Sequence, residues 1–260
     1  MSKTWIWVLV GAVISLGLVV SLGVAYVIMH YYYYPYYYSG NYLVSSLTGD
    51  YYYGTYPINQ TIKEVMEIPG YVHVYSSNNT IVFTSRDINL LVLAMMGDDA
   101  EKMFNATSPP YAHGDVFIIY GLINPTLVIP AGATIHVTFV NLDDDMYHNF
   151  VVTVVSPPYP YNVMPYVGMY GGMGPQMMLL MRWLPPANYK ANHAYGYEYT
   201  LTITEPGTYW YLCTYPGHAE DGMYGEIIVT GNSASPTHPV VQYPGPYYGS
   251  GWMGGMMGWW

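Results

Sequence analysis

The chain has 260 residues, of which 52% are hydrophobic and only 8% are charged, and six basic against sixteen acidic side chains give a formal net charge of −10. This balance excludes nucleic acid as a partner, because phosphates are bound by clusters of Lys and Arg. The single cysteine, Cys213, excludes an intramolecular disulfide and any metal centre that needs two thiolates from one chain. Thirty-three tyrosines supply polarity without ionising, which suits a chain that faces an acidic medium.

Residues 1–30 are predicted to form a cytoplasmic tip and a transmembrane anchor. No charged residue lies between Lys3 and Asp50, and the stretch Trp5–Met29 is almost entirely apolar. About 20 apolar residues cross the hydrocarbon layer of a bilayer, whereas the core of a signal peptide is usually ~7–15 residues long. Because Lys3 precedes the span, the positive-inside rule predicts a single-pass protein of the cell membrane with its ectodomain on the extracytoplasmic side. A cleaved signal peptide is the alternative, with residues 23–25 (GVA) as its cleavage site.

The residues after the anchor divide into a stalk and the start of a domain. Residues 31–56 are rich in Tyr, Gly and Ser without aliphatic periodicity, and we interpret them as a stalk. Ile62, Val65 and Met66 recur at helical spacing, which predicts a short helix over residues 58–68.

The domain at residues 57–231 is predicted to be all-β. Its β-branched and aromatic runs, separated by Gly, Pro, Asn and Asp, are YVHVY, TIVFT, INLLVLAMM, DVFIIYG, TLVIP, TIHVTFVNL, HNFVVTVV, YEYTLTITE, GTYWYLC and GEIIVTG. Many short strands with turn signals between them indicate a β-sandwich or barrel. The tail at residues 232–260 is rich in Pro, Gly, Tyr, Met and Trp, and its composition predicts no packed element. Its methionines either bind Cu(I) weakly or lie against a partner, or the tail is simply disordered.

The sequence around the lone cysteine carries the chemistry. It reads GTYWYLCTYPGHAEDGMYGEIIV, so that Cys213, His218 and Met223 follow the spacing C-x4-H-x4-M. A strand ends at the thiol, Pro216 and Gly217 turn the chain, and a new strand begins near residue 224. Thiolate, imidazole and thioether are the donors of a blue copper site, where two His and one Cys form a plane and Met lies on the axis.

A second histidine must come from elsewhere in the chain, and two compete. His136 lies inside the strand TIHVTFV and alternates with apolar neighbours, which predicts a surface residue. His148 follows the loop DDDMY and opens the strand HNFVVTVV, where a loop can direct an imidazole into a site. His148 is therefore the predicted ligand.

These motifs give the chain its resemblance to a known family. The segments NPTLVIPAGATIHVTFVN, HNF, PPYPYNVMP and GTYWYLCTYPGHAEDGMYGEIIV follow one another in an order that resembles the cupredoxins, and among them the rusticyanins of acidophilic iron-oxidising bacteria and the membrane-anchored sulfocyanins. The likeness covers residues 57–231. It implies a Greek-key β-sandwich and one type 1 copper ion that cycles between Cu(I) and Cu(II).

The resemblance also implies roles for individual residues. The copper ligands are His148, Cys213, His218 and Met223, found by matching the family motif. One position departs from rusticyanin, which has a serine after the first histidine where this chain has Asn149, as in most other cupredoxins. There the asparagine tethers the Ser or Thr after the cysteine, so we expect a hydrogen bond between Asn149 and Thr214.

The expected function is one-electron transfer with a respiratory oxidase or cytochrome, without enzymatic activity. No H-x-H motif for an oxygen-reducing copper cluster occurs, and one cysteine cannot form a binuclear purple centre. The electron is expected to leave through His218, on an exposed turn, and the docking surface is expected to include Met164, Met169, Pro216 and Ala219. The Met-rich segment 163–184 either docks a partner or folds over the copper. The alternatives are a Met-rich copper-handling protein and a Tyr-rich surface protein that has lost its metal.

Overall fold

The computed structural model describes residues 20, 21, 24, 44–47, 52–170, 182–231 and 241–242. The chain divides into two units, Met1–Leu43 and Val44–Trp260, and the second contains every element described below. Within the described part of the chain, no helix is long and apolar enough to cross a membrane. The predicted anchor lies almost entirely outside the described residues.

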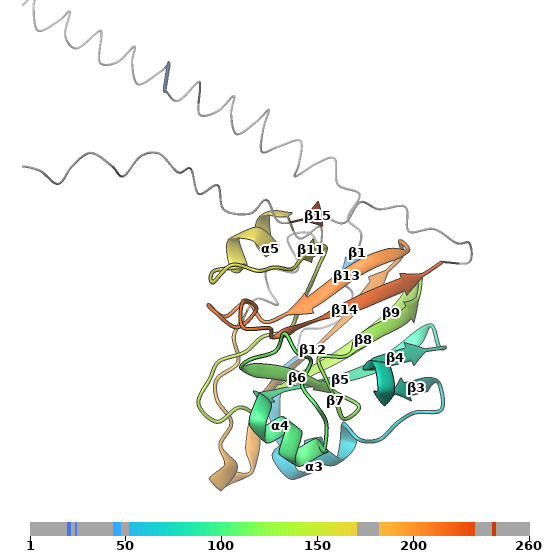
Figure 1. The fold of residues 1–260 in the computed structure, drawn as a ribbon, viewed down its shortest axis with the longest axis vertical. Coiled ribbons are helices and arrows are strands. Elements are labelled where there is room, and N and C mark those ends of the chain that lie inside the picture. The colour runs from blue at the N-terminus through green and yellow to red at the C-terminus, as the bar shows by residue number, and fades with distance from the viewer. Residues whose placement is uncertain are drawn as a thin grey trace, which may run out of the picture. The chain divides into compact units, whose positions relative to one another are not determined.

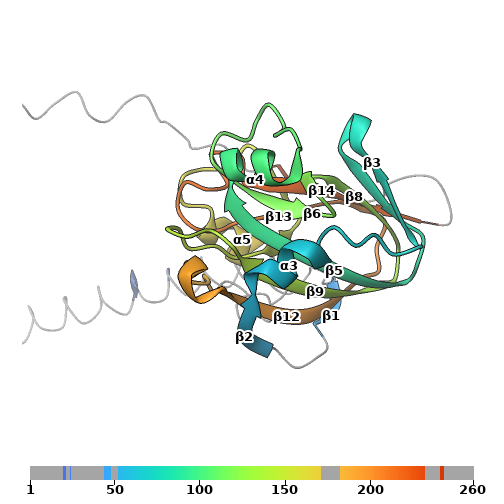
Figure 2. The same ribbon diagram turned by 90° about the horizontal axis from the view of Figure 1, so that it is seen from below.

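The first of two large sheets has seven strands. Its order is β1 (Val44–Leu47), β12 (His193–Ile203), β9 (Ala133–Asn141), β5 (Asp87–Met96), β6 (Asp115–Ile119) and β7 (Leu122–Ile123), with β2 (Tyr52–Pro57) also paired to β12. Neighbours are antiparallel except for β5 and β9, which run parallel over residues 87–94. Figure 2 shows β5, β9 and β12 side by side.

The second sheet has six strands and carries the cysteine. Its order is β10 (Val151–Thr153), β13 (Gly207–Leu212), β14 (Tyr224–Thr230), β8 (Thr126–Pro130), β4 (Thr80–Phe83) and β3 (Val72–Tyr75). Strands β14, β8 and β4 pair in parallel, while β13 and β14 form an antiparallel hairpin (Figure 1). The turn of this hairpin is the C-x4-H-x4-M segment.

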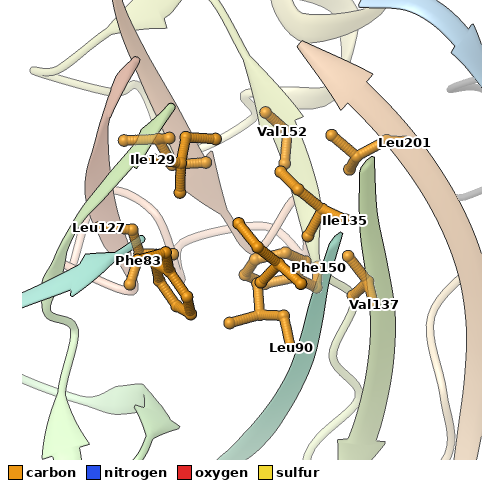
Figure 3. A pocket seen from close by; sticks show the side chains of 11 residues that line it. Phe83, Leu90, Leu127, Ile129, Ile135, Val137, Phe150, Val152 and Leu201 are labelled. Atoms are coloured by element: carbon orange, nitrogen blue, oxygen red, sulfur yellow. The ribbon is translucent and has the colours of Figure 1, made fainter. Parts of the chain in front are cut away.

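The core lies between the two sheets, as the alternating pattern of apolar residues requires. The apolar side chains that face one another there, shown in Figure 3, include Leu90, Ile135, Val137 and Leu201 from the seven-stranded sheet and Phe83, Leu127 and Ile129 from the six-stranded sheet. Toward β10, Phe150 packs against Phe117 and Tyr211, with ring centroids 5.3 and 5.2 Å apart. The hydroxyl of Tyr197 accepts a 2.8 Å hydrogen bond from the backbone N–H of Phe150, which fixes the chain two residues after His148.

Short helices occupy the connections. These are α3 (Ile58–Glu64), α4 (Gly97–Phe104), α5 (Met164–Tyr170) and the 3-10 turns η2 (Ser76–Asn78) and η4 (Tyr189–Ala191). Figures 1 and 2 show α3 and α4 at the same end of the sheets. Helix α3 confirms the helix predicted from residue 58, although it ends at residue 64, before the predicted end.

The interpretation of residues 31–56 as a stalk is wrong for two segments. Strand β1 and most of β2 lie within that range, and both pair with β12 in the seven-stranded sheet. Strand pairing uses only backbone N–H and C=O groups, so a segment rich in Tyr, Ser and Gly can form a strand as well as a linker. In the tail, β15 (Val241–Gln242) pairs in parallel with β11 (Val155–Ser156), so this part of the tail does form an element.

Candidate metal centre

The β13–β14 turn brings Cys213, His218 and Met223 together. Cys213 directly follows β13, and its N–H donates to the carbonyl of Met223, which directly precedes β14. The N–H of Met223 donates in turn to the carbonyl of His218 at 2.8 Å. Gly217 and Gly222 have φ of 90° and 97°, which glycine adopts without steric cost, so the chain can reverse within a few residues.

His148 reaches the same point from another part of the chain. It lies before β10 and forms a two-way backbone bridge with Leu184, in which the N–H of Leu184 donates to the carbonyl of His148 at 2.7 Å. Its side chain is fully buried.

The ligand atoms of three predicted residues face one another. Nδ1 of His148 lies 3.1 Å from Nδ1 of His218, and Sγ of Cys213 lies 3.8 and 3.6 Å from these two nitrogens. A point equidistant from all three atoms is about 2.0 Å from each, the length of a bond between a first-row metal such as zinc and an imidazole nitrogen. Met223 is also fully buried beside them. The three donors therefore fit a single metal ion.

Without metal, Cys213 and His148 shift each other's pKa toward the charged pair of thiolate and imidazolium. Burial by itself raises the pKa of the Cys213 thiol, but hydrogen bonds with His148 and His218 outweigh it and lower the pKa to about 6. Burial lowers the pKa of His148, whereas Asp143 and the Cys213 sulfur raise it, with a net result of about 9. A thiolate is the form that binds metal, so the site stabilises the reactive form of its only cysteine.

Asn149 clamps the two ligand-bearing segments, as predicted. Its Nδ2 donates to Oγ1 of Thr214 at 2.7 Å, and its Oδ1 accepts from the N–H of Thr214, also at 2.7 Å. Nε1 of Trp183 donates to the same hydroxyl oxygen at 3.1 Å. The residues next to His148 and Cys213 are thus joined directly.

The comparisons with known proteins place this site in a family. Residues 69–240 match the family model described as the sulfocyanin (SoxE) domain. The chain belongs to the sulfocyanin family. It is also 40% identical over 114 residues to rusticyanin of Acidithiobacillus ferridurans, a match that spans 44% of this chain and 54% of that protein. A rusticyanin of Acidithiobacillus ferrooxidans is 31% identical over 156 residues, which is 59% of this chain and 83% of the relative.

Solved structures of rusticyanin are similar as well. One from Thiobacillus ferrooxidans is 25% identical, covers 70% of this chain and all of its own, and has a TM-score of 0.49. A structure of reduced rusticyanin is 24% identical, covers 69% of this chain and all of its own, and has a TM-score of 0.48.

The chain is therefore a rusticyanin-like blue copper cupredoxin. Sulfocyanins bind one type 1 copper ion, and in this chain the donor set for it is His148, Cys213, His218 and Met223. When bound, the copper supplies a centre that accepts and releases one electron.

Other predicted features of this sulfocyanin need correction. His218 is not on an exposed turn: its side chain is 7% exposed, because Tyr215 packs on it with ring centroids 4.7 Å apart. Ala219, predicted on the docking surface, is only 2% exposed. It lies inside a tight turn, which is closed by a hydrogen bond from the N–H of Gly222 to the carbonyl of Ala219. Pro216 and Met164 are half-buried, and the side chain of Met169 lies outside the described residues.

His136 is a surface residue of β9, as predicted. Its Nε2 lies 2.9 Å from Oδ1 of Asp87, and its Nδ1 lies 2.9 Å from Oγ1 of Thr200. Both partners come from neighbouring strands, so the imidazole takes part in a cross-strand network remote from the cysteine turn.

Two acidic residues beside the site were not predicted as part of it. Oδ2 of Asp143 lies 3.4 Å from Nε2 of His148, and Oδ2 of Asp115 lies 3.8 Å from that nitrogen and 3.7 Å from Nδ1 of His218. Asp143 lies in the loop before His148 and is only 3% exposed. Its position five residues before His148 is the one signal that could have identified it.

Proposed function

We propose that this sulfocyanin is a membrane-anchored electron carrier that moves single electrons on the extracytoplasmic face to or from a respiratory oxidase or cytochrome. The observation that carries the proposal is the buried triangle of two Nδ1 atoms and one Sγ. A single thiolate limits the chain to one blue copper, so it transfers one electron at a time. The clamp of Asn149 and the tight cysteine turn hold the donors in one geometry, which favours rapid electron transfer over catalysis.

The anchor is supported by the uncharged, apolar stretch at residues 5–29. The low content of charged side chains supports an acidic extracytoplasmic medium, because tyrosine keeps its polarity at any acidic pH. The full chain, expressed in a bacterial host, should remain with the membranes after an alkaline carbonate wash. A variant that begins at residue 31 should be released. Release of both forms would contradict the anchor and leave the copper proposal intact.

The electron-carrier proposal is tested by visible absorption of the domain purified without residues 1–30 and loaded with Cu(II). We expect an intense blue band from thiolate-to-copper charge transfer, and we expect Cys213→Ser to abolish it while far-UV circular dichroism stays unchanged. The sandwich is held by its apolar faces, so loss of the thiolate should not unfold it. A serine variant that kept the band would contradict the assignment of Cys213.

A pair of histidine variants provides the matched control. His148→Ala should lose the blue band, whereas His136→Ala, on the exposed face of β9, should retain it. Copper binding without an intense band would favour a Met-rich copper-handling protein, and no copper binding would favour a Tyr-rich surface protein.

A further inference from the structure

Two buried polar atoms behind the metal centre have no hydrogen-bond partner within the described residues. They are Oδ2 of Asp143 and Nε2 of His148, and they lie 3.4 Å from each other. Buried polar groups nearly always have a hydrogen-bond partner, so each buried polar atom without one requires an explanation. A shift of a few tenths of an ångström would make these two atoms partners.

The Asp143 side chain is held in this direction. Its Oδ1 accepts hydrogen bonds from the N–H groups of Asp145 and Met146, both at 3.0 Å. Its own N–H donates to Oδ1 of Asn141 at 3.0 Å, and its carbonyl accepts from the N–H of Ala187 at 2.7 Å. With one carboxylate oxygen and the backbone fixed, the other oxygen is directed at the imidazole.

The imidazole is fixed from its other side. Nδ1 of His148 belongs to the triangle with His218 and Cys213, and the backbone is held by the bridge to Leu184. A neutral imidazole carries one proton, and the nitrogen that binds a metal must be the unprotonated one. The proton therefore belongs on Nε2, where a carboxylate can accept it in a hydrogen bond.

We propose that Asp143 is a positioning residue of the copper site: its carboxylate accepts a hydrogen bond from Nε2–H of His148, fixes the tautomer that leaves Nδ1 free for copper, and lowers the reduction potential. The last effect follows from charge. A buried negative charge stabilises Cu(II) more than Cu(I), because the oxidised ion carries one more positive charge. This inference rests on the proposed copper site.

Asp115 is the competing partner for the same nitrogen. Its Oδ2 is 3.8 Å from Nε2 of His148 and slightly closer, at 3.7 Å, to Nδ1 of His218, and its side chain is more exposed than that of Asp143. Solvent screens a partly exposed charge, so the shorter and deeper contact of Asp143 dominates. Asp115→Asn is accordingly expected to change the potential less than Asp143→Asn.

The test compares variants of Asp143 with a control variant in the copper-loaded domain. Asp143→Asn removes the charge but keeps an acceptor oxygen, so the blue band should persist while the midpoint potential rises. We expect the ratio of Cu(II) to Cu(I) affinity to fall at least tenfold, which is about 59 mV for a one-electron couple. Asp143→Ala removes the acceptor too, and should also weaken Cu(II) binding by about 10- to 100-fold. Asp144→Asn is the matched control, since it removes the same charge from the exposed neighbouring residue and should barely move the potential.

A second measurement uses the wild-type protein, so its result does not depend on whether a variant folds. In the reduced, diamagnetic wild-type protein, nitrogen-15 NMR of the His148 ring should show a slowly exchanging proton on Nε2. An unprotonated Nε2 would overturn the proposal, as would equal potentials for Asp143→Asn, Asp144→Asn and wild type, or a shift confined to Asp115→Asn. Failure of the copper site itself is distinguishable, because the wild-type domain would then have no blue band.

Discussion

At the residue scale, the clamp between Asn149 and Thr214 uses every polar atom of one amide. Both of its hydrogen bonds are 2.7 Å long and fully buried, and they join segments 65 residues apart in the chain. A third bond from Trp183 reaches the same hydroxyl. Removing the amide therefore leaves a buried backbone N–H without an acceptor, which costs more than the loss of an exposed bond.

We expect Asn149→Ala to lower the free energy of unfolding by about 2 kcal/mol, because it removes two buried hydrogen bonds and leaves the N–H of Thr214 unpaired. Urea unfolding of the domain measures the loss. Asn89→Ala, at an exposed position of β5, is the control and should change stability by less than about 0.5 kcal/mol. Equal effects of the two variants would show that the clamp adds nothing to stability.

Met223 offers a second prediction at this scale. A thioether is soft and favours Cu(I), whereas an amide oxygen is harder and favours Cu(II), so Met223→Gln should lower the midpoint potential. Met103→Gln makes the same substitution at an exposed position of α4 and should leave the potential unchanged. Cyclic voltammetry of both variants decides the matter, and an unchanged or raised potential for Met223→Gln would exclude Met223 as the axial ligand.

At the element scale, the β13–β14 turn is defined by its glycines and by a loop that packs on it. Gly222 has φ of 97°, and a Cβ at this position would overlap the carbonyl oxygen of Tyr111. Its own carbonyl accepts a 2.9 Å hydrogen bond from Nδ2 of Asn124, which links the turn to the end of β7. The spacing of the ligands thus depends on a residue that bears no functional group.

Gly222→Ala should destabilise the domain by about 3 kcal/mol, through left-handed backbone strain and overlap with Tyr111. The blue band should also weaken, since Met223 and Cys213 share this turn. Gly70→Ala is the control, because nothing lies within 4 Å of a Cβ there. Thermal unfolding followed by circular dichroism measures both variants, and a Gly222→Ala protein as stable as the control would contradict the account of the turn.

Sequence patterns predicted the regular strands well, because β-branched runs between turn residues report directly on local structure. Strands β8, β9, β13 and β14 fall where such runs occur. The pattern placed a strand start at His148, but β10 begins at Val151, since His148 pairs only with Leu184 outside the main ladder. Helix α4 was missed, because its eight residues are too few to show a repeating helical pattern of apolar side chains.

The metal site was predictable only in part, because a sequence motif reports on residues that are close in the chain and not on those that the fold brings together. Cys213, His218 and Met223 lie within one turn, so their spacing in the sequence is also their spacing in space. Asp115 comes from β6, over a hundred residues before His218, and only the fold brings it close. Asp143 is nearer in sequence, but its burial depends on bonds to Asn141 and Ala187 that no periodicity reports.

At the scale of the whole molecule, uncharged aromatic side chains lie between the copper ligand His218 and the surface. His218 is covered by Tyr215, and Tyr215 stacks on Tyr147 with ring centroids 6.3 Å apart. Tyr147 is 44% exposed, so a partner can contact this stack although the histidine itself is buried. Trp183 packs on the edge of Tyr215 at 5.1 Å. Apolar rings that exclude water suit a partner surface that is also apolar.

Docking should therefore depend little on salt. Steered association falls steeply with ionic strength only when charged patches meet, and 8% charged residues leave few for such a patch. We expect the rate of electron transfer to the proposed respiratory partner, measured in native membranes, to change less than about twofold between low and physiological salt. The exposed Asp144 and Asp145 lie in the loop beside Tyr147, so Asp144→Asn with Asp145→Asn is the control and should leave the rate unchanged. A steep fall with salt in the wild type, abolished in the double variant, would show that these two carboxylates direct the encounter and that the aromatic stack does not.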